Sequence, residues 1–182
     1  MQKRVFIIHG WEGNPNLNWF PWLKSELELR GFDVKVPEMP DSNHPEMEAW
    51  ISHLAGVVGT PDEECYFVGH SLGCITILRY LESLEEGTEV GGAVLVAGFS
   101  AGLGIDQISD FFRTPVNWEM VGSRCKKFVA INSDNDPFVP LKYGELFREK
   151  LGARLIIKHE GHFSKDVTAL PDAVDAILDI SG

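Results

Sequence analysis

The chain has 182 residues with a hydrophobic fraction of 44% and a formal net charge of −11, so we expect a single globular domain over residues 1–182. The acidic balance argues against nucleic acid and against anionic membrane surfaces, because both attract basic patches. No apolar run approaches the roughly 20 residues that span a bilayer, and no signal peptide is recognisable at the start of the sequence. Three cysteines without metal-ligand spacing predict reduced thiols and a cytoplasmic location.

Short apolar runs alternate along the chain with segments in which apolar residues recur at helical spacing. The runs predict strands at residues 5–8, 33–36, 65–69, 92–98, 128–132 and 154–158. The periodic segments predict helices at residues 19–30, 45–58, 72–84, 141–151 and 173–180. Residues 99–124 lack clear periodicity and are too short for a separate lid domain, but they could form one or two short helices near the mouth of a site.

This alternation predicts an α/β fold with three layers (α/β/α), a roughly six-stranded, mostly parallel sheet and no large lid. Ligands of such sheets bind outside the carboxyl ends of the strands. The loops that carry His9, Ser71, Asp136 and His162 all follow predicted strands. The sequence therefore places four loops with reactive side chains along one edge of the sheet.

The loop after the central predicted strand reads Gly69-His70-Ser71-Leu72-Gly73. This is the G-x-S-x-G pattern of a nucleophile elbow, in which a strained strand-to-helix turn exposes a serine hydroxyl above a parallel sheet. The two glycines suit places where the strand and the helix crowd together and a Cβ would clash. An incidental serine in a glycine-flanked turn would give the same pattern, but this one lies between a predicted strand and a predicted helix, as the mechanism requires.

A serine hydroxyl needs a base to activate it and a carboxylate to orient that base. In this fold the chain order is Ser, then Asp or Glu, then His, and Ser71, Asp136 and His162 follow that order. His159 also comes after the serine, but it lies at the end of the last predicted strand rather than in the turn that contains Gly161. The order excludes the four histidines that precede the serine, which are His9, His44, His53 and His70.

The acid is harder to assign, because Asp134 and Asp136 share one loop. Asp136 precedes Pro137, and a proline ring restricts the backbone and so favours a fixed side-chain direction. We therefore predict that Asp136 orients the histidine. The alternative that both carboxylates only shape a turn, a common role of Asp, stays open.

Acyl transfer develops negative charge on an oxygen, which two preorganised backbone N–H groups can stabilise. One donor should be Leu72, at the start of the elbow helix, where the helix dipole also helps. The other should come from the loop after the first strand, and we choose Trp11 because Gly10 lets the backbone approach closely. Trp11 is also the one aromatic residue that we expect to line an acyl pocket.

Five stretches of the chain carry a family resemblance. They are His9-Gly10-Trp11, Gly69-His70-Ser71-Leu72-Gly73, Phe112-Arg113-Thr114-Pro115 with Trp118-Glu119, Asp136-Pro137-Phe138-Val139-Pro140 and Gly161-His162-Phe163. Together they resemble the retinoblastoma-binding protein 9 (YdeN-like) branch of the α/β-hydrolases. The resemblance implies a compact hydrolase without the usual first two strands, and it supports Asp136 over Asp134 as the acid.

The motif from which that family takes its name, Leu-x-Cys-x-Glu, does not occur in this sequence. The nearest segment is Leu72-Gly73-Cys74-Ile75-Thr76, which ends in threonine and lies within the elbow. We therefore expect no retinoblastoma-type partner.

The motifs together predict a serine hydrolase that cleaves a small carboxylic ester, or an amide with the same groups, through an acyl-enzyme intermediate. We expect neither cofactor nor metal, since no His, Asp or Glu pair sits at i, i+4 on a predicted helix in a ligand-like pattern. The alternative from another class is a catalytically idle module that keeps the hydrolase fold and binds another protein. The presence of all three triad residue types weighs against that alternative.

Overall fold

A computed structural model describes residues 2–182 and contains one sheet with strand order β2-β1-β3-β4-β5-β6. The strands are β1 (Arg4–Ile8), β2 (Asp33–Lys35), β3 (Cys65–His70), β4 (Gly92–Val96), β5 (Phe128–Ser133) and β6 (Arg154–Lys158). Every neighbouring pair is parallel. The register aligns Ile8 with Gly69 and Gly69 with Leu95, so the carboxyl ends of β1, β3 and β4 lie side by side.

Helices follow the strands, and glycine and proline mark some of their ends. The helices are α1 (Phe20–Glu28), α2 (Met47–Val58), α3 (Leu72–Ser83), the 3₁₀ helix η1 (Asp106–Phe112), α4 (Trp118–Ser123), α5 (Lys142–Leu151) and α6 (Pro171–Ser181). Helix α5 ends at Gly152, whose φ of 64° is left-handed and suits glycine. Pro171 begins α6, where its missing N–H would have no helical partner.

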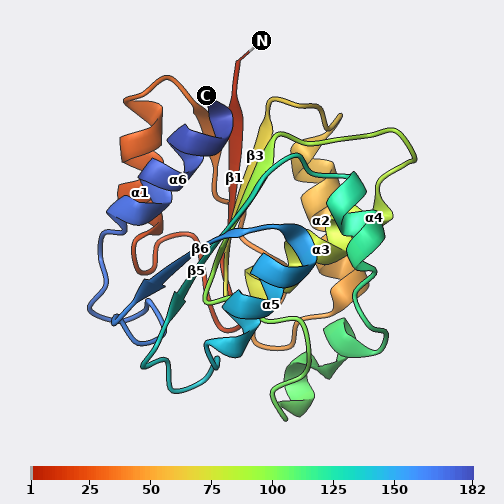
Figure 1. Cartoon of the computed structure of the whole chain (residues 1–182), viewed down its shortest axis with the longest axis vertical. Helices are drawn as coiled ribbons and strands as arrows, with labels where there is room; N and C mark the ends of the chain where they lie inside the picture. The colour runs from red at the N-terminus through yellow and green to blue at the C-terminus, as the bar shows by residue number, and fades with distance from the viewer. Residues whose placement is uncertain (1) are drawn as a thin grey trace.

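The helices form one layer on each face of the sheet. In Figure 1, α1 and α6 lie on one side of the strands, and α2, α3 and α4 lie on the other. Each layer closes its own apolar core: Trp19 and Ile177 belong to the α1/α6 core, whereas Trp50, Leu78 and Phe147 belong to the core under α2, α3 and α5. The predicted three-layer fold is therefore confirmed.

Burial differs between the centre and the edge of the sheet. All six residues of β3 are buried, because helices cover both of its faces. By contrast, every residue of the edge strand β6 is at least partly exposed to solvent, and Ile157 is 52% exposed. The serine therefore follows the most enclosed kind of strand, and the predicted base follows the most open one.

The elements lie where the sequence predicted them, and no predicted end differs from the observed one by more than two residues. Helix α1 begins at Phe20 rather than at Trp19, because the backbone of Trp19, with a ψ of 0°, is not helical and Trp19 is the N-cap. The segment 99–124 without clear periodicity contains η1 and α4, two short helices.

The site is positioned by the point where the strand order reverses. From β1 the chain moves to β2 on one side, whereas from β3 it moves to β4 on the other. Loops that leave such neighbours diverge and open a crevice at their carboxyl ends. Gly10 and Trp11 leave β1 on one side of this crevice, and Ser71 leaves β3 on the other.

Candidate active site

Ser71 occupies a strained turn between β3 and α3. Its φ of 55° and ψ of −118° lie outside the regions that a residue with a side chain favours. Such strain persists only where the surroundings impose it, and it is frequent at functional sites. The N–H of Ser71 donates to the Val96 carbonyl over 2.9 Å, which ties the turn to the end of β4.

Two glycines allow this turn to form. A Cβ built on Gly73 would lie 2.2 Å from the Ile8 carbonyl oxygen, and one on Gly69 would lie 2.8 Å from the Cys74 nitrogen. Both contacts are with backbone atoms, which cannot move aside as a flexible side chain can. The glycines of the sequence motif therefore set how closely α3 packs against β1 and β3.

The three predicted triad side chains meet at the carboxyl edge of the sheet. The Nε2 atom of His162 lies 3.0 Å from the Ser71 Oγ, and its Nδ1 atom lies 2.8 Å from Asp136 Oδ2. A carboxylate only accepts, so Nδ1 carries the proton and Nε2 presents its lone pair to the serine hydroxyl. This tautomer is the one in which an imidazole can take a proton from a serine.

Asp136 is held as a carboxylate in a nearly closed environment. Its side chain is 1% exposed, and its second oxygen accepts the N–H groups of Phe138 at 2.8 Å and Val139 at 3.0 Å. Burial alone would raise the pKa of this carboxyl, but the hydrogen bonds from His162 and from these two N–H groups outweigh it. The net effect lowers the pKa of Asp136 below its ordinary value.

The neighbouring carboxylate has a different partner. Asp134 Oδ1 lies 2.6 Å from the Nδ1 atom of His159, and the exposed fractions of the two side chains are 53% and 77%. This pair stands in solvent, where an ion pair contributes little to stability. The structure thus brings Asp136, and not Asp134, to His162.

The loop after β1 lies against the elbow. A Cβ built on Gly10 would come within 3.1 Å of the Ser71 Cβ and 3.6 Å of the Leu72 nitrogen. In residues 2–182, the N–H groups of Trp11 and Leu72 donate to no backbone carbonyl. Both predicted donors therefore remain available to an oxygen that enters beside Ser71.

The peptide between Gly10 and Trp11 is held by the buried ring of His9. His9 Nδ1–H donates to the Gly10 carbonyl oxygen over 2.8 Å, and His9 Nε2 accepts the Met39 N–H over 3.0 Å. Burial lowers the pKa of His9, which favours the neutral ring that this pattern needs. Because a trans peptide is planar, fixing the carbonyl of Gly10 also fixes the opposite direction of the Trp11 N–H.

A small apolar cavity of about 250 Å³ opens next to Ser71. It is lined by Trp11, Glu12, Ser71, Leu72, Phe99, Leu103, Ile105, Ile108, Phe138, Val139 and His162. Among the aromatic residues, Trp11 was expected here, whereas Phe99 and Phe138 were not. Leu103, Ile105 and Ile108 come from segment 99–124, which was expected near the mouth of a site, but without a periodic pattern the sequence could not single out these side chains.

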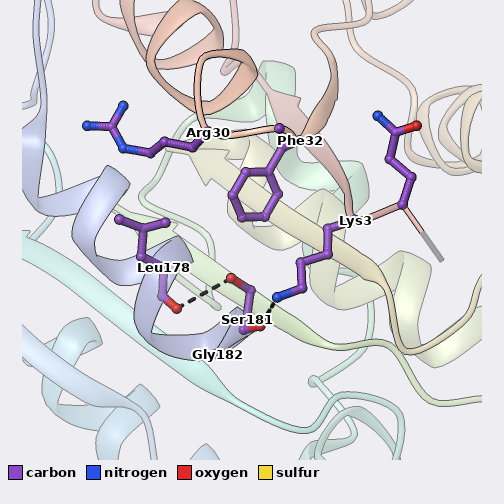
Figure 2. Close-up of a pocket in the computed structure, with 8 residues that line it drawn as sticks. Lys3, Arg30, Phe32, Leu178, Ser181 and Gly182 are labelled. Atoms are coloured by element: carbon purple, nitrogen blue, oxygen red, sulfur yellow. Dashed lines mark hydrogen bonds between the residues drawn. The ribbon is translucent and has the colours of Figure 1, made fainter.

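A second hollow, of about 450 Å³, lies at the opposite end of the sheet (Figure 2). There the Lys3 ammonium donates to the Ser181 carbonyl, and the Ser181 hydroxyl donates to the Leu178 carbonyl. These polar groups already satisfy one another and no triad-like arrangement is present, so we place the candidate site at Ser71.

The three cysteines offer no competing nucleophile, because all of them are buried and free. Burial raises the pKa of Cys65 to about 11 and that of Cys125 to about 12, and it raises the pKa of Cys74 as well. A thiol reacts as its thiolate, so these groups are inert near neutral pH.

Within residues 2–182, no three His, Cys, Asp or Glu side chains are grouped so that they could hold a metal ion. None of the helices there has the length and apolar character needed to cross a membrane.

Comparison with known proteins identifies the family. A model of the family described as "Serine hydrolase" matches residues 5–172. The chain is 34% identical over 181 residues to YdeN of Bacillus subtilis (strain 168), covering 97% of this chain and 95% of that protein. It is 29% identical over 149 residues to the serine hydrolase RBBP9 of Rattus norvegicus, covering 80% of this chain and 77% of that protein.

The crystal structure of the B. subtilis ydeN gene product superposes on this fold with a TM-score of 0.94 at 33% identity, covering 99% of each chain. The expected resemblance to the YdeN-like branch is thus confirmed. The chain belongs to the serine hydrolase family and is an enzyme with hydrolase activity.

Proposed function

We propose that this enzyme hydrolyses a small carboxylic ester or amide through an acyl-enzyme formed on Ser71, with His162 as the base and Asp136 as its orienting acid. The observation that carries the proposal is the continuous hydrogen-bonded chain from Ser71 through His162 to Asp136, with distances of 3.0 and 2.8 Å. A nucleophile, a base and an orienting group within hydrogen-bond reach are the signature of nucleophilic catalysis.

Each step follows from this arrangement. His162 Nε2 takes the proton of the Ser71 hydroxyl as Oγ attacks the substrate carbonyl carbon, and the imidazolium is stabilised by Asp136. The carbonyl oxygen becomes an anion, which the N–H groups of Leu72 and Trp11 would receive. His162 then returns the proton to the leaving group, and a water activated by the same base releases the acid and regenerates Ser71.

The cavity supports a small, uncharged and apolar acyl group. Its volume of about 250 Å³ lies below the roughly 300–1,000 Å³ of pockets that hold drug-sized ligands. Leu103, Ile105 and Ile108 would contact the acyl chain, whereas the carboxylate of Glu12 would disfavour an anionic one. Ester and amide leaving groups would use the same catalytic groups, so the leaving group is left open.

We propose that the segment around η1 forms a fixed wall of this cavity rather than a large lid. Arg79 of α3 is 5% exposed and donates to the carbonyls of Phe111, over 3.1 Å, and Thr114. Asp110 accepts the Met47 N–H of α2 over 2.8 Å. These buried and partly buried bonds support a wall anchored to two helices.

We propose one domain that acts in the cytoplasm on a small-molecule substrate, without cofactor or metal and without a nucleic-acid, membrane or retinoblastoma-type partner. The free, buried thiols support a reducing compartment. In the proposed mechanism, side chains and backbone N–H groups of the chain would fill every role that acyl transfer needs.

Turnover of matched p-nitrophenyl esters and p-nitroanilides, with acyl chains of two to twelve carbons, tests the proposal. We expect hydrolysis of the shorter esters and loss of at least about 10³-fold in kcat for Ser71→Ala. Equal rates in the wild type and Ser71→Ala would contradict the proposed nucleophile. A wild type that turns over none of these compounds would favour the idle interaction module instead.

A further inference from the structure

Two ring N–H groups hold successive carbonyls of the loop that carries His162. His70 Nε2 lies 2.8 Å from the His162 carbonyl oxygen, and Trp19 Nε1–H donates to the Phe163 carbonyl over 3.0 Å. Both rings are buried beneath the loop. We propose that His70 and Trp19 are positioning residues, which set the place of the His162 ring by clamping its backbone; the inference rests on the proposed role of His162 as the base.

The loop needs such a clamp because its backbone is strained. Gly161 has a φ of 57° and Phe163 a φ of 52°, so both residues flanking His162 lie in the left-handed region. Phe163 carries a side chain, and a bulky residue adopts this conformation only where its surroundings impose it. Its ring is 0% exposed in the core under α1 and α6, and its carbonyl is the one that Trp19 holds.

His70 reaches the loop because of its place on the central strand. Side chains of a strand alternate between its two faces, and His70 therefore points to the same face as Val68, toward α1. Its ring lies 5.9 Å from the rings of Trp19 and Phe20, edge to face, and 5.0 Å from the ring of His162. Two neighbouring residues of the elbow thus hydrogen-bond His162: the Ser71 hydroxyl bonds its ring, and the His70 ring bonds its backbone carbonyl.

The chemistry of His70 suits a fixed donor. A carbonyl oxygen only accepts, so Nε2 of His70 carries the proton in this contact. Burial and the nearby His162 lower the pKa of His70 to about 3, which keeps the ring neutral. The His70 ring hydrogen-bonds the backbone carbonyl of His162 and no side chain of the triad, so it positions the base rather than taking part in proton transfer.

The clamp can be broken without removing a triad residue. We expect His70→Met to lower kcat on a short ester by roughly ten- to a hundredfold with little change in KM, because small misplacements of a catalytic group are costly. His70→Gln should restore much of kcat, since its amide nitrogen is as many bonds from Cβ as the imidazole Nε2. Trp19→Phe keeps an aromatic ring but loses the N–H, and should lower kcat in the same way.

A matched core variant separates positioning from stability. Val5 is buried in the same core but lies at the other end of β1 from the loop, so Val5→Ala should lower Tm and leave kcat per active site unchanged. Because both clamp residues act on one loop, the losses in the His70→Met, Trp19→Phe double variant should not be additive. The inference would be overturned if His70→Met had the kcat of the wild type, or if the kcat of His70→Gln were no higher than that of His70→Met.

Hydrogen exchange gives a readout that does not depend on turnover. We expect the amides of a peptide spanning residues 159–166 to exchange faster in His70→Met and Trp19→Phe than in Val5→Ala, when each variant is measured at the same interval below its own Tm. Unchanged exchange in both clamp variants would show that the clamp does not hold the loop, even if the wild type hydrolysed esters. If the clamp variants exchanged faster but the wild type hydrolysed none of the esters, the proposed function would be contradicted and the clamp would not.

Discussion

Ser71 and His162 lie 3.0 Å apart at their side chains, yet different kinds of structure hold them. The serine turn is fixed by backbone packed on backbone, where Gly73 leaves no room for a Cβ beside the Ile8 carbonyl. The His162 loop follows the open edge strand β6 and is held by side chains. The rings of His70 and Trp19 bond two of its carbonyls. The side chains of Ser133 and Asn135 accept the N–H groups of Glu160 and Gly161.

The difference shows how two halves of one site tolerate change. A glycine at a backbone contact has no substitute, because any side chain must overlap a neighbouring main-chain atom. A loop held by several polar side chains can lose one bond and keep its fold, but the base then loses its exact direction. Substitutions at the elbow should therefore lower the free energy of unfolding, whereas substitutions around His162 should lower kcat.

The largest effect should come from the carboxylate that orients His162. Asp136→Asn should leave the fold intact but favour the wrong tautomer of His162, and kcat should fall by about 10⁴-fold, as the same change does in serine proteases. Asp134→Asn is the matched control, since Asp134 pairs with the exposed His159 and should cost only a few-fold. The measurement is kcat on one short ester, with melting curves for both variants. If Asp134→Asn were the crippled enzyme, the assignment of the acid would be wrong.

The elbow side should fail through stability instead. Gly73→Ala would place a Cβ 2.2 Å from the Ile8 carbonyl oxygen, and we expect a loss of about 3 kcal/mol or more in the free energy of unfolding. Gly56 of α2 has open space around it, so Gly56→Ala should instead add about 0.5–1 kcal/mol. Urea denaturation of the two variants compares them directly. Equal stabilities would refute the idea that packed backbone fixes the elbow.

The smallest effect concerns the pH dependence of stability. The pKa of Asp136 is lower in the folded protein than the value of about 3.9 in an unfolded chain. Its carboxylate therefore adds stability above the unfolded pKa, and this contribution is lost as the pH falls below about 4 and through the folded pKa. The difference in unfolding free energy between wild type and Asp136→Asn should shrink from pH 7 to pH 3. A difference that stays constant over this range would mean that the carboxylate is not stabilised by folding.

The sequence was a good guide wherever local pattern decides the structure. Buried strands such as β3 are continuous apolar runs, and the elbow glycines are required by local geometry, so both could be predicted. The order of Ser71, Asp136 and His162 predicted which side chains would meet, because parallel strands end at one edge. Their catalytic roles stay a prediction.

Other parts of the site depend on tertiary contacts that leave no pattern in the sequence. The wall from Leu103 to Ile108 has no regular period, since Arg79 and Asp110 hold its segment through bonds to distant backbone atoms. His70 was set aside because it precedes the serine, a rule that applies to the base and says nothing of what supports the base. Trp19 was assigned to a helix by its spacing, although its indole bonds Phe163, which is 144 residues away in the chain.

Covalent labelling of the nucleophile tests the central claim most directly. The wild type would be incubated with a fluorophosphonate probe, digested, and analysed by mass spectrometry, with Ser71→Ala and Asp136→Asn beside it. We predict a single adduct on the peptide that contains Ser71, none in Ser71→Ala, and strongly slowed labelling in Asp136→Asn, because the base would hold the wrong tautomer. An adduct on another residue, or labelling that is unchanged in Ser71→Ala, would contradict the account.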